Sequence, residues 1–432
     1  MEYAEALAKL HSLNRFGIRP GLSRVRELLR RLSDPQLDPK TRYIHIAGTN
    51  GKGSCGAMLE SVFRAAGAKT GFFSSPHLLH HCERYRIDGR PLPEADFARL
   101  FTQVWERIGE MEKEGWETPT EFEAVTALSL LAFGEAVVEW AVMECGLGGL
   151  YDSTNVIPAE IALITNVGFD HMDYLGSTVE EIAAQKAGII HAGQTVITAA
   201  EGAALSVIEA KAREQGASLL VAGRDFEAGV RSCSDRGFTL DVDCAGRRYC
   251  GLDLPLLGRH QVQNAACAIQ AAETAGVPEE FIREGLAAVR WPCRLEAVSR
   301  EPYVVIDGAH NEPGLKALAE ALELYWPGKR ICGLVGMLDD KQREQALAHV
   351  LPRLERVIVT RPGYPARSKD WAGVGDVARA YGKEPLLMED SAAALDAALN
   401  TDCDMVLICG SLYLAADLRG LFPTNDRLID VK

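Results

Sequence analysis

YIHIAGTNGKGS, residues 43–54, predicts a buried strand followed by a glycine-rich turn that contains a single lysine. The turn approaches the phosphate-binding pattern G-x-x-x-x-G-K-[ST] but departs from it at two positions. Counting back from Lys52, the pattern requires glycine at position 46, and the chain has Ile46. It requires Ser or Thr at position 53, where the chain has Gly53 and places Ser54 one residue later. Whether this turn binds phosphate is the first question that the sequence raises.

The chemistry of the turn favours a phosphate-binding loop. Gly48, Gly51 and Gly53 let backbone N–H groups approach an anion closely. A helix predicted to begin near Ser54 adds its positive N-terminal end. In such loops the lysine reaches the terminal phosphates and the hydroxyl serves Mg²⁺. The alternative is a strand–helix turn that uses glycine for geometry alone, but strand, loop, lysine, serine and helix all occur in the expected order.

Composition places the chain among globular proteins of about two domains, since 47% of its 432 residues are hydrophobic and 25% are charged. The formal net charge of −14 argues against a general nucleic-acid binder and leaves room for a small anionic ligand in a local basic pocket. No apolar run of about 18 residues and no signal-peptide core are present, so we expect a cytoplasmic protein without a membrane span. The 11 cysteines lack a C-x-x-C pair and indicate reduced thiols.

Apolar β-branched runs alternate with amphipathic runs, which is typical of a parallel sheet covered by helices. Helices are predicted over 54–67 and over 177–190, where Thr178 and Glu181 form a capping-box pattern. Buried strands are predicted at five places: 42–48, 69–75, 139–146, 161–167 and 194–200.

A second alternating block starts near residue 302, with strands predicted in PYVVIDGAHN, KRICGLVGML, RVIVTRP and DMVLICGSL. Trp291 and Pro292 interrupt the helical pattern before it, so we place a boundary near residue 295 and expect domains at 1–294 and 295–432. Residues 223–257 are expected to form a small antiparallel insert. The predicted fold class is α/β: a P-loop-type, mostly parallel sheet in the N-terminal domain, and a smaller Rossmann-like α/β C-terminal domain.

Unusual polar residues follow the predicted strands, where open α/β sheets bind ligands. Glu144 ends an apolar strand, so it is either a buried carboxylate suited to Mg²⁺ or a residue emerging into solvent. His171 lies between Asp170 and Asp173, where a structural histidine is the alternative to a metal ligand. Lys186 is either a lysine that reaches solvent from the side of its helix or a desolvated amine with a lowered pKa.

Taken together, the chain resembles the folylpolyglutamate synthase/dihydrofolate synthase family of the Mur ligase superfamily. The family writes its phosphate loop T-N-G-K-G-[ST], which accounts for the two departures. The matching stretches occur in order along nearly the whole chain: HIAGTNGKGS, SSPHL, ERYRIDG, TEFEAVTAL, ECGLGGLYDSTN, ITNVGFDHMDYLG, AAQKAGII, QVQNAACAI, DGAHN, GMLDDK and CGSLYLA.

The resemblance implies a ligase that uses ATP and Mg²⁺, with K⁺ as a further candidate cation, to join L-glutamate to a folate or to dihydropteroate. ATP phosphorylates the substrate carboxylate, and the glutamate amine then displaces phosphate. The implied partners are these small molecules alone, with no nucleic acid or membrane, and the implied state is a monomer.

The resemblance also implies roles for single residues. The catalytic residues are Lys52, Lys186 and His310, with Lys186 carbamylated. The nucleotide contacts are Thr49, Asn50, Gly51, Lys52, Gly53, Ser54, Asn264, Arg294 and Asp307. The Mg²⁺ ligands are Ser54, Ser75, Glu144 and His171. The folate and glutamate contacts are Thr120, Glu121, Phe122, Glu123, His310 and Ser411.

The chain departs from the family pattern at three positions: Leu150 replaces an arginine, Gln185 replaces the glutamate often found before the lysine, and Glu312 precedes Pro313. Two alternatives follow: a Mur-type ligase acting on another carboxylate, and a nucleotide-binding ATPase that ligates nothing. SSPHL and TEFEA favour folate over the first. His310, Asn311 and Ser411 speak against the second alternative, which Leu150 keeps open. The sequence does not decide between one folate reaction and both.

Overall fold

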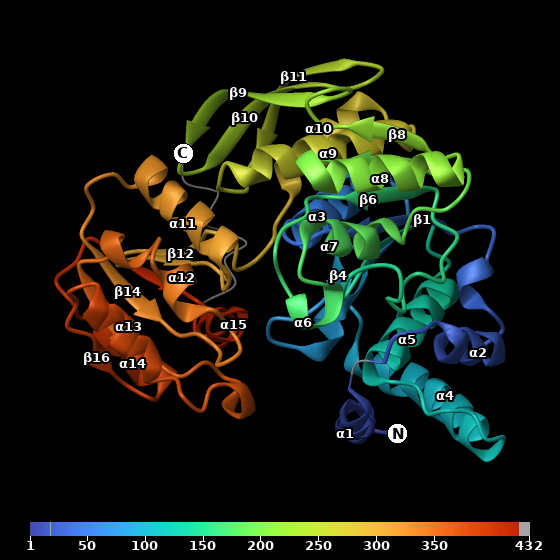
Figure 1. Ribbon diagram of the computed structural model, residues 1–432, viewed down its shortest axis with the longest axis horizontal. Coiled ribbons are helices and arrows are strands. Elements are labelled where there is room, and N and C mark those ends of the chain that lie inside the picture. The colour runs from blue at the N-terminus through green and yellow to red at the C-terminus, as the bar shows by residue number, and fades with distance from the viewer. Residues whose placement is uncertain (18, 423–432) are drawn as a thin grey trace. The chain divides into compact units, whose positions relative to one another are not determined.

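The structure, a computed structural model, describes residues 1–17 and 19–422 and divides into two compact units (Figure 1). The first unit contains Met1–Ser232, Thr239–Pro255 and Val262–Val289. The second contains Cys233–Phe238, Leu256–Gln261 and the chain from Arg290 onward. Each unit is a sheet with helices packed on it, which confirms the predicted α/β class.

The sheet of the first unit has eight strands in the order β4-β3-β2-β5-β1-β6-β7-β8. Six of them run parallel: β1 (Arg42–Ala47), β2 (Thr70–Phe73), β5 (Trp140–Glu144), β6 (Ile161–Ile164), β7 (Thr195–Thr198) and β8 (Ser218–Val221). The two edge strands, β3 (Tyr85–Ile87) and β4 (Arg90–Pro91), run antiparallel. Strands such as β5 are buried along their whole length, as parallel strands covered on both faces must be.

All five strands predicted for this region form, but each is shorter than predicted. The missing residues lie mainly at the carboxyl ends, where the prediction extended β2, β5 and β6 through residues 75, 146 and 167. These residues leave the sheet and enter the loops at its carboxyl edge. Apolar character alone therefore overestimated the length of each strand.

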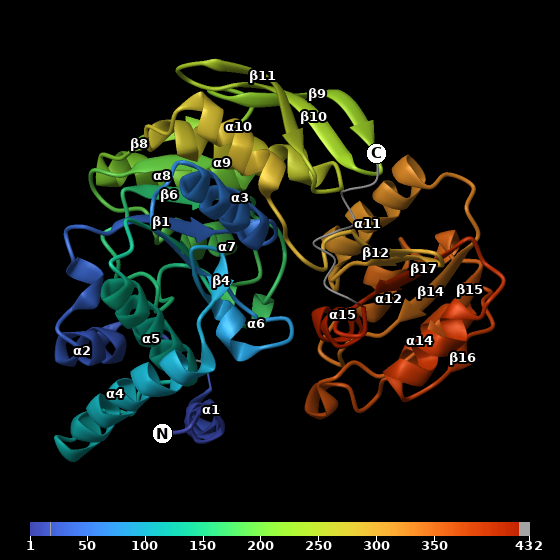
Figure 2. The same ribbon diagram turned by 180° about the vertical axis from the view of Figure 1, so that it is seen from behind.

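Helices cover both faces of this sheet. α7 (Val179–Ala187) and α8 (Gly202–Gln215) lie on one face and α3 (Lys52–Ala65) on the other (Figures 1 and 2). α3 begins at Lys52, two residues earlier than predicted, because Gly51 takes a φ of +86° and turns the chain directly into the helix. The predicted capping box of α7 forms: the backbone N–H of Glu181 donates to Thr178 Oγ1 at 3.2 Å.

Four further helices pack together against the β2–β5 side of the sheet in one apolar cluster. They are α1 (Tyr3–Ser12), α2 (Ser23–Arg31), α4 (Glu94–Lys113) and α5 (Glu121–Ala136). α5 is buried from Glu123 to Phe133. A helix this apolar is held rigidly by its surroundings, so the position of its N-terminus is fixed. The remaining helices of the region are α6 (Met172–Leu175), α9 (His260–Thr274) and α10 (Glu279–Ala288).

The insert predicted at residues 223–257 forms a separate three-stranded sheet in the order β11-β10-β9. Its strands are β9 (Glu227–Ser234), β10 (Gly237–Asp243) and β11 (Arg248–Leu254). The turn between β9 and β10 belongs to the second unit and the rest of β10 to the first.

The second unit has a six-stranded sheet in the order β12-β13-β17-β14-β15-β16. The four strands predicted here, β13 (Tyr303–Ile306), β14 (Ile331–Val335), β15 (Arg356–Val359) and β17 (Met405–Cys409), all form and run parallel with β16 (Leu386–Leu387). β12 (Glu296–Arg300) runs antiparallel at one edge. The helices are α11 (Glu312–Tyr325), α12 (Arg343–Leu347), α13 (Gly373–Ala380), α14 (Ser391–Leu399) and α15 (Leu412–Arg419).

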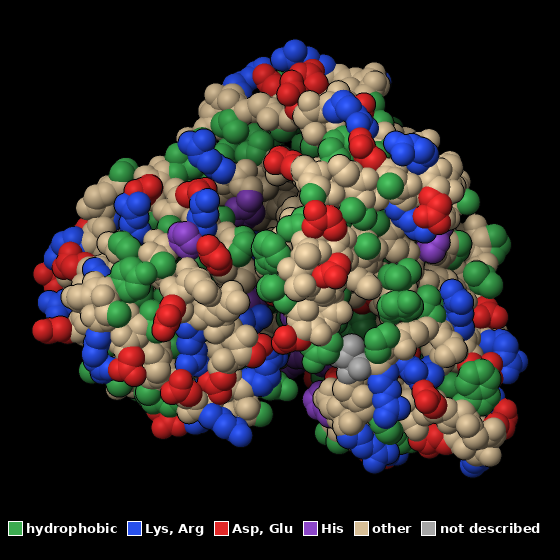
Figure 3. Space-filling model, in the orientation of Figure 1, with side chains coloured by type: hydrophobic (Ala, Val, Ile, Leu, Met, Phe, Trp, Pro, Cys, Tyr) green, Lys and Arg blue, Asp and Glu red, His purple; other side chains and the backbone are tan. Residues whose placement is uncertain are grey.

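The surface of the chain mixes both signs of charge, and Figure 3 shows Lys and Arg side chains interleaved with Asp and Glu over the face that it draws. Among residues 1–17 and 19–422, no helix combines the length and the apolar composition that crossing a membrane requires.

Close packing between α3 and α10 depends on a glycine. A Cβ added to Gly285 lies 2.4 Å from the Cα of Val62, and the hydroxyl of Ser61 donates to the Gly285 carbonyl at 2.7 Å. We predict that Gly285→Ala lowers the free energy of unfolding by about 1–3 kcal/mol, because two backbones must move apart.

The matched control is Gly109→Ala in α4, where an added Cβ meets no heavy atom within 4 Å. It should raise stability by roughly 0.5–1 kcal/mol through helix propensity alone. Urea denaturation followed by circular dichroism measures both changes. Equal effects of the two substitutions would show that the α3–α10 contact does not depend on Gly285.

Candidate active site

The site is built at the carboxyl edge of the first unit's sheet, where the central strand β1 lies between β5 and β6. The registers pair Ile46 with Glu144 on one side and Ala47 with Ile164 on the other. The loop that follows β1 therefore emerges between Glu144 and the 165–168 segment. This is the edge at which open α/β sheets bind their ligands.

The loop after β1 is held by hydrogen bonds to residues 165–168. The N–H of Thr49 donates to the Asn166 carbonyl and the N–H of Asn50 to Asn166 Oδ1, both at 3.0 Å. The Asn50 carbonyl accepts from Thr165 Oγ1 at 2.7 Å and from Asn166 Nδ2 at 3.0 Å. The Thr49 hydroxyl and the backbone of Gly168 complete the set. These contacts fix the loop without using its remaining backbone N–H groups.

Two glycines of the loop are required by close neighbours. A Cβ at Gly48, whose φ is +151°, would lie 1.9 Å from Thr165 Oγ1. A Cβ at Gly51 would lie 2.4 Å from Oδ1 of Asn264, which therefore sits directly on the loop. The phosphate-binding pattern expects its first glycine at position 46, and in this loop the first glycine is Gly48. The loop is packed between Thr165 and Asn264.

Lys52 and Glu144 form an ion pair at the rim of the loop. Lys52 Nζ donates to the Gly48 carbonyl at 3.0 Å and lies 4.0 Å from Glu144 Oε1. Glu144 is only 5% exposed, and the N–H of Ser75 donates to its Oε2 at 3.3 Å. The alternative that Glu144 emerges into solvent is therefore wrong. Ser54 is also buried, in the first turn of α3.

Lys186 lies on α7 and is 3% exposed, so the alternative of a lysine reaching solvent is wrong as well. Burial, with a smaller contribution from the charge of Lys52, lowers the pKa of Lys186 to about 7. Cys145 and Asp170 act weakly in the opposite direction. A large fraction of this amine is therefore neutral near pH 7, unlike an ordinary lysine.

His171 is placed differently from the other expected metal ligands. Its side chain is 48% exposed, its φ is +50°, and its Nε2 lies 3.9 Å from Asp170 Oδ1. Within the described residues, no three His, Cys, Asp or Glu side chains converge as a metal site. Of the expected ligands only Glu144 and His171 are of these types, and Ser54 and Ser75 would contribute hydroxyl oxygens.

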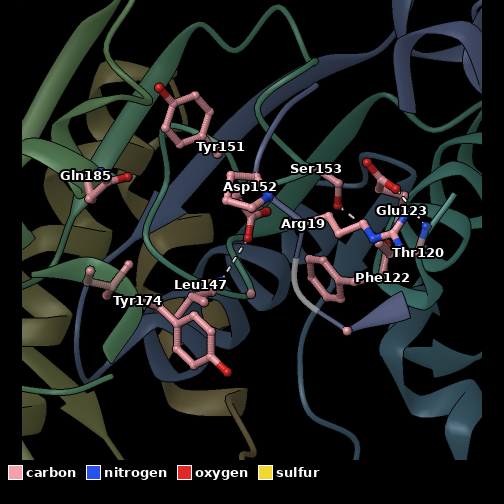
Figure 4. Close-up of a pocket in the computed structure, with 14 residues that line it drawn as sticks. Arg19, Thr120, Phe122, Glu123, Leu147, Tyr151, Asp152, Ser153, Tyr174 and Gln185 are labelled. Carbon is pink, nitrogen blue, oxygen red and sulfur yellow. Dashed lines mark hydrogen bonds between the residues drawn. The ribbon is translucent and has the colours of Figure 1, made fainter. Parts of the chain in front are cut away.

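A cavity of about 340 Å³ opens beside the N-terminus of α5 (Figure 4). The rings of Phe122, Tyr151 and Tyr174 come to it from three different segments. The lining residues are Gly17, Arg19, Pro20, Thr120, Phe122, Glu123, Gly146, Leu147, Tyr151, Asp152, Ser153, Tyr174, Leu175 and Gln185. Aromatic and apolar walls with a few polar groups are typical of a site for a small organic ligand.

Three of the four expected residues at 120–123 line this cavity. Thr120 caps α5, and its N–H donates to Glu123 Oε2 at 2.7 Å. Arg24 Nε donates to the same carboxylate at 3.1 Å, while Glu123 Oε1 is buried and has no hydrogen-bond partner among the described residues. The fourth residue, Glu121, is half-buried outside the cavity lining, and burial raises its pKa.

Several lining residues were not singled out from the sequence. Asp152 is buried, and its oxygens accept from the N–H of Leu147 at 2.8 Å and of Thr154 at 3.0 Å. Burial raises the pKa of Asp152. The polar run DSTN after the GLGG turn was the available signal. Tyr151 and Tyr174 carried none, because isolated tyrosines are common.

Leu150, which stands where the resemblance expects arginine, does not line this cavity. Its N–H donates to the Gln185 carbonyl at 2.7 Å, and its Cα lies 2.4 Å from the position of a Cβ on Gly188. Its side chain lines a second cavity of the first unit. Leu150 therefore contributes to the wall of that second cavity and not to the cavity beside α5.

The expected residues of the second unit gather at the carboxyl ends of two adjacent parallel strands, β13 and β17. Asp307 accepts from the N–H groups of Leu295 and Ala309 at 2.9 and 2.8 Å. The ring of His310 contacts the Gly308 carbonyl through Nδ1 at 2.9 Å. Ser411 caps α15. Arg294 also belongs to this group, since its Nη1 lies 2.7 Å from the position of a Cβ on Gly308.

Comparison with known protein families defines the general class of protein to which this chain belongs. The family model of the Mur ligase middle domain matches residues 46–272, and that of the Mur ligase glutamate ligase domain matches residues 293–412. A sheet with a phosphate loop at its carboxyl edge, followed by a second α/β unit, is thus the architecture of a Mur-type ligase.

Individual relatives define the family within that class. Dihydrofolate synthase/folylpolyglutamate synthase of Bacillus subtilis is 34% identical over 96% of this chain and 98% of its own. Folylpolyglutamate synthase of Mycobacterium tuberculosis, solved with ADP and AMPPCP, is 31% identical, with a TM-score of 0.90 over 98% of this chain and 100% of its own. Escherichia coli FolC with DHPP and ADP is 31% identical, with a TM-score of 0.87 over 98% and 97%. This chain belongs to the folylpolyglutamate synthase/dihydrofolate synthase family.

The pKa of Lys186 makes stability depend on pH in a known direction. Between about pH 7 and its ordinary value near 10.5 the unfolded chain carries the proton and the folded chain does not. Stability contributed at this position therefore rises with pH across that window. We predict that Lys186→Met is more stable than the wild type near about pH 6.5, and that the difference shrinks toward about pH 9.5.

Urea denaturation in CO₂-free buffer at several pH values measures this difference, and groups common to both proteins cancel. A difference that stays constant with pH would mean that the buried amine keeps an ordinary pKa.

Proposed function

We propose that this chain is an ATP-dependent ligase that adds L-glutamate to a folate substrate, either dihydropteroate, tetrahydrofolate or both, through an acyl phosphate. One observation carries the proposal. A braced phosphate loop, a buried carboxylate and a buried lysine with a lowered pKa meet at one sheet edge, in a chain that belongs to this family over its whole length. The relatives solved with ADP, AMPPCP and DHPP support both kinds of substrate.

The phosphate loop is assigned to the ATP phosphates. The β- and γ-phosphates would be surrounded by the backbone N–H groups from Thr49 to Ser54 and by the ammonium of Lys52. The loop is already held in position for this by hydrogen bonds to Thr165 and Asn166. Asn264 lies against the loop at Gly51 and contacts the nucleotide in this proposal. Arg294 and Asp307 are assigned to the nucleotide as well.

Activation of the substrate carboxylate needs positive charge more than covalent help. A carboxylate oxygen attacks the γ-phosphorus, the bond to the β-phosphate oxygen breaks, and ADP leaves. Lys52 offsets the charge that develops on the phosphoryl oxygens. Ser54, Ser75 and Glu144 are hard oxygen donors that fit Mg²⁺, with His171 as the fourth assigned ligand, and Mg²⁺ would supply further charge neutralisation there.

Lys186 is assigned the role of a carbamylated lysine. Its neutral amine attacks the carbon of CO₂, an N–C bond forms, and the amine proton passes to water. An ammonium group cannot react in this way, so the lowered pKa is the property that this role requires. The resulting carbamate would place a negative charge beside Lys52, where the uncarbamylated lysine offers a neutral amine.

The cavity beside α5 is assigned to the pteridine ring. Phe122 and Tyr174 offer aromatic faces, and Oε1 of Glu123 is a buried acceptor without a hydrogen-bond partner among the described residues. A pterin ring carries N–H donors that satisfy such an acceptor. Thr120 and Glu121 belong to the same substrate-binding stretch.

The glutamate substrate is assigned to the second unit. His310 and Ser411 lie at the ends of β13 and β17, and the glutamate amine displaces phosphate from the acyl phosphate to form the amide. In this assignment residues 1–294 bind ATP and folate, and residues 295–432 bind glutamate and contribute Asp307 to the nucleotide site. The chain acts as a monomer on small molecules.

ATP turnover measured against both co-substrates tests the function. We expect ADP release only when an acceptor, dihydropteroate or tetrahydrofolate, and L-glutamate are both present with Mg²⁺. The acceptor that supports turnover identifies the reaction. ADP release that is indifferent to acceptor and to glutamate would contradict the ligase assignment and favour a simple ATPase.

The same assay includes Lys186→Ala, with Lys316→Ala on the exposed face of α11 as the matched control. Lys186→Ala should lose activity that small carboxylates such as acetate partly restore, whereas the control should behave as the wild type. A fully active Lys186→Ala enzyme would remove the carbamate from the proposal.

A further inference from the structure

A second cavity of the first unit, of about 370 Å³, has no role in the reaction described above. It shares one lining residue, Tyr151, with the cavity beside α5. Its walls come from α2, from the loop after β5, from the chain after α7, and from α8. Four separate segments thus converge on one pocket that is open to solvent, with Arg26 and His191 exposed at its surface.

The charge of this cavity is unusual for the chain that holds it. Arg26 of α2, Lys211 of α8 and His191 line it, and among the described residues no Asp or Glu does. The pKa of His191 is lowered mainly by burial and further by the positive charges of Lys211 and Arg26. Both cations therefore act on the imidazole. Positive groups facing one space, in a chain of net charge −14, repel one another until an anion enters.

The neighbouring acidic group does not fill the cavity. Lys211 lies 3.2 Å from Glu214, one helical turn along α8, and the Glu214 side chain is 63% exposed. That pair is a surface ion pair of the kind that contributes little. Lys211 therefore retains most of its attraction for a ligand, and Arg26 adds an exposed cationic side chain from α2.

The cavity is also shaped by fixed groups. Asn155 Oδ1 contacts His191 Nε2 at 2.8 Å, and Asn155 Nδ2 donates to the carbonyls of Leu150 and Gly188 at 3.2 and 3.0 Å. Because Oδ1 only accepts, the imidazole N–H points at Asn155. Leu150 and Ile190 add apolar wall. A rigid polar end beside an apolar side suits a small anion with some carbon framework.

We propose that this cavity is a binding site for a small oxyanion, a carboxylate or a phosphoryl group, held by Arg26 and Lys211. The occupant is either a phosphate or the carboxylate end of a short organic acid. The site goes beyond the proposed ligase function, because binding there requires no turnover. Leu150 is part of the cavity wall, and its N–H donates to the carbonyl of Gln185, the residue before Lys186. An occupant of the cavity would therefore stabilise the C-terminal end of α7.

Isothermal titration of the full chain with inorganic phosphate and, separately, with glutarate tests the site. Binding to the phosphate loop is common to all variants and cancels in the comparison. The double variant Arg26→Gln/Lys211→Gln should bind one or both probes roughly tenfold or more weakly than the wild type, because two charged contacts are lost. The control is Arg213→Gln, an exposed residue of α8 outside the cavity, which should leave binding unchanged.

The probe that the double variant binds more weakly identifies the class of ligand. Weaker binding of phosphate alone indicates a phosphoryl ligand, and weaker binding of glutarate alone indicates a carboxylate ligand. Weaker binding of both indicates a shared oxyanion site. Unchanged affinities in the double variant, or an equal loss in Arg213→Gln, would overturn the proposal. If the double variant melts below the wild type, Lys211→Gln is compared with Lys211→Arg. The arginine must restore binding, and failure to do so counts against the site.

Discussion

The phosphate loop depends on hydrogen bonds from residues 165–168, the segment that follows the neighbouring strand β6. The loop that leaves β1 makes few hydrogen bonds of its own, and residues 165–168 satisfy the carbonyl of Asn50 and the N–H groups of Thr49 and Asn50. This arrangement requires β1 and β6 to be adjacent and parallel, with Ala47 paired to Ile164. It also requires glycine at positions 48 and 51, because side chains of Thr165 and Asn264 occupy the space that a Cβ would need. Preorganised N–H groups then face an anion without a further ordering cost.

The brace also sets the electrostatics around the loop. Lys52 folds onto the Gly48 carbonyl beside Glu144, and Lys186 is buried on the other helix layer within reach of the Lys52 charge. Two ammonium groups in a poorly hydrated space are unfavourable, so the more deeply buried one loses its proton most easily. The lowered pKa of Lys186 is therefore a consequence of the same packing that fixes the loop. Loop, carboxylate and neutral amine form one coupled site.

Much of the fold and part of the site were predictable from local sequence, and the remaining features of the site depended on tertiary contacts. Long β-branched runs and the Thr178 capping box gave reliable strands and helices, because burial and helix capping are encoded locally. TNV at 165–167 was taken as the end of a strand, but these residues leave the sheet and, with Gly168, hold the phosphate loop. The burial of Lys186 could not be decided, because α7 alone does not show what covers it. Tyr151 reaches the cavity from a loop and Tyr174 reaches it from the short helix α6, an arrangement that no local pattern contains.

The central claim is that this edge of the sheet activates a substrate carboxylate by phosphorylation. An isotope experiment tests the claim directly. The acceptor that supports turnover, dihydropteroate or tetrahydrofolate, is labelled with ¹⁸O in its reacting carboxylate and incubated with Mg²⁺, ATP and L-glutamate. The released phosphate is then analysed by mass spectrometry. Formation of an acyl phosphate moves one carboxylate oxygen onto phosphorus, so one ¹⁸O atom should appear in each phosphate released. Unlabelled phosphate released in step with amide formation would contradict the account.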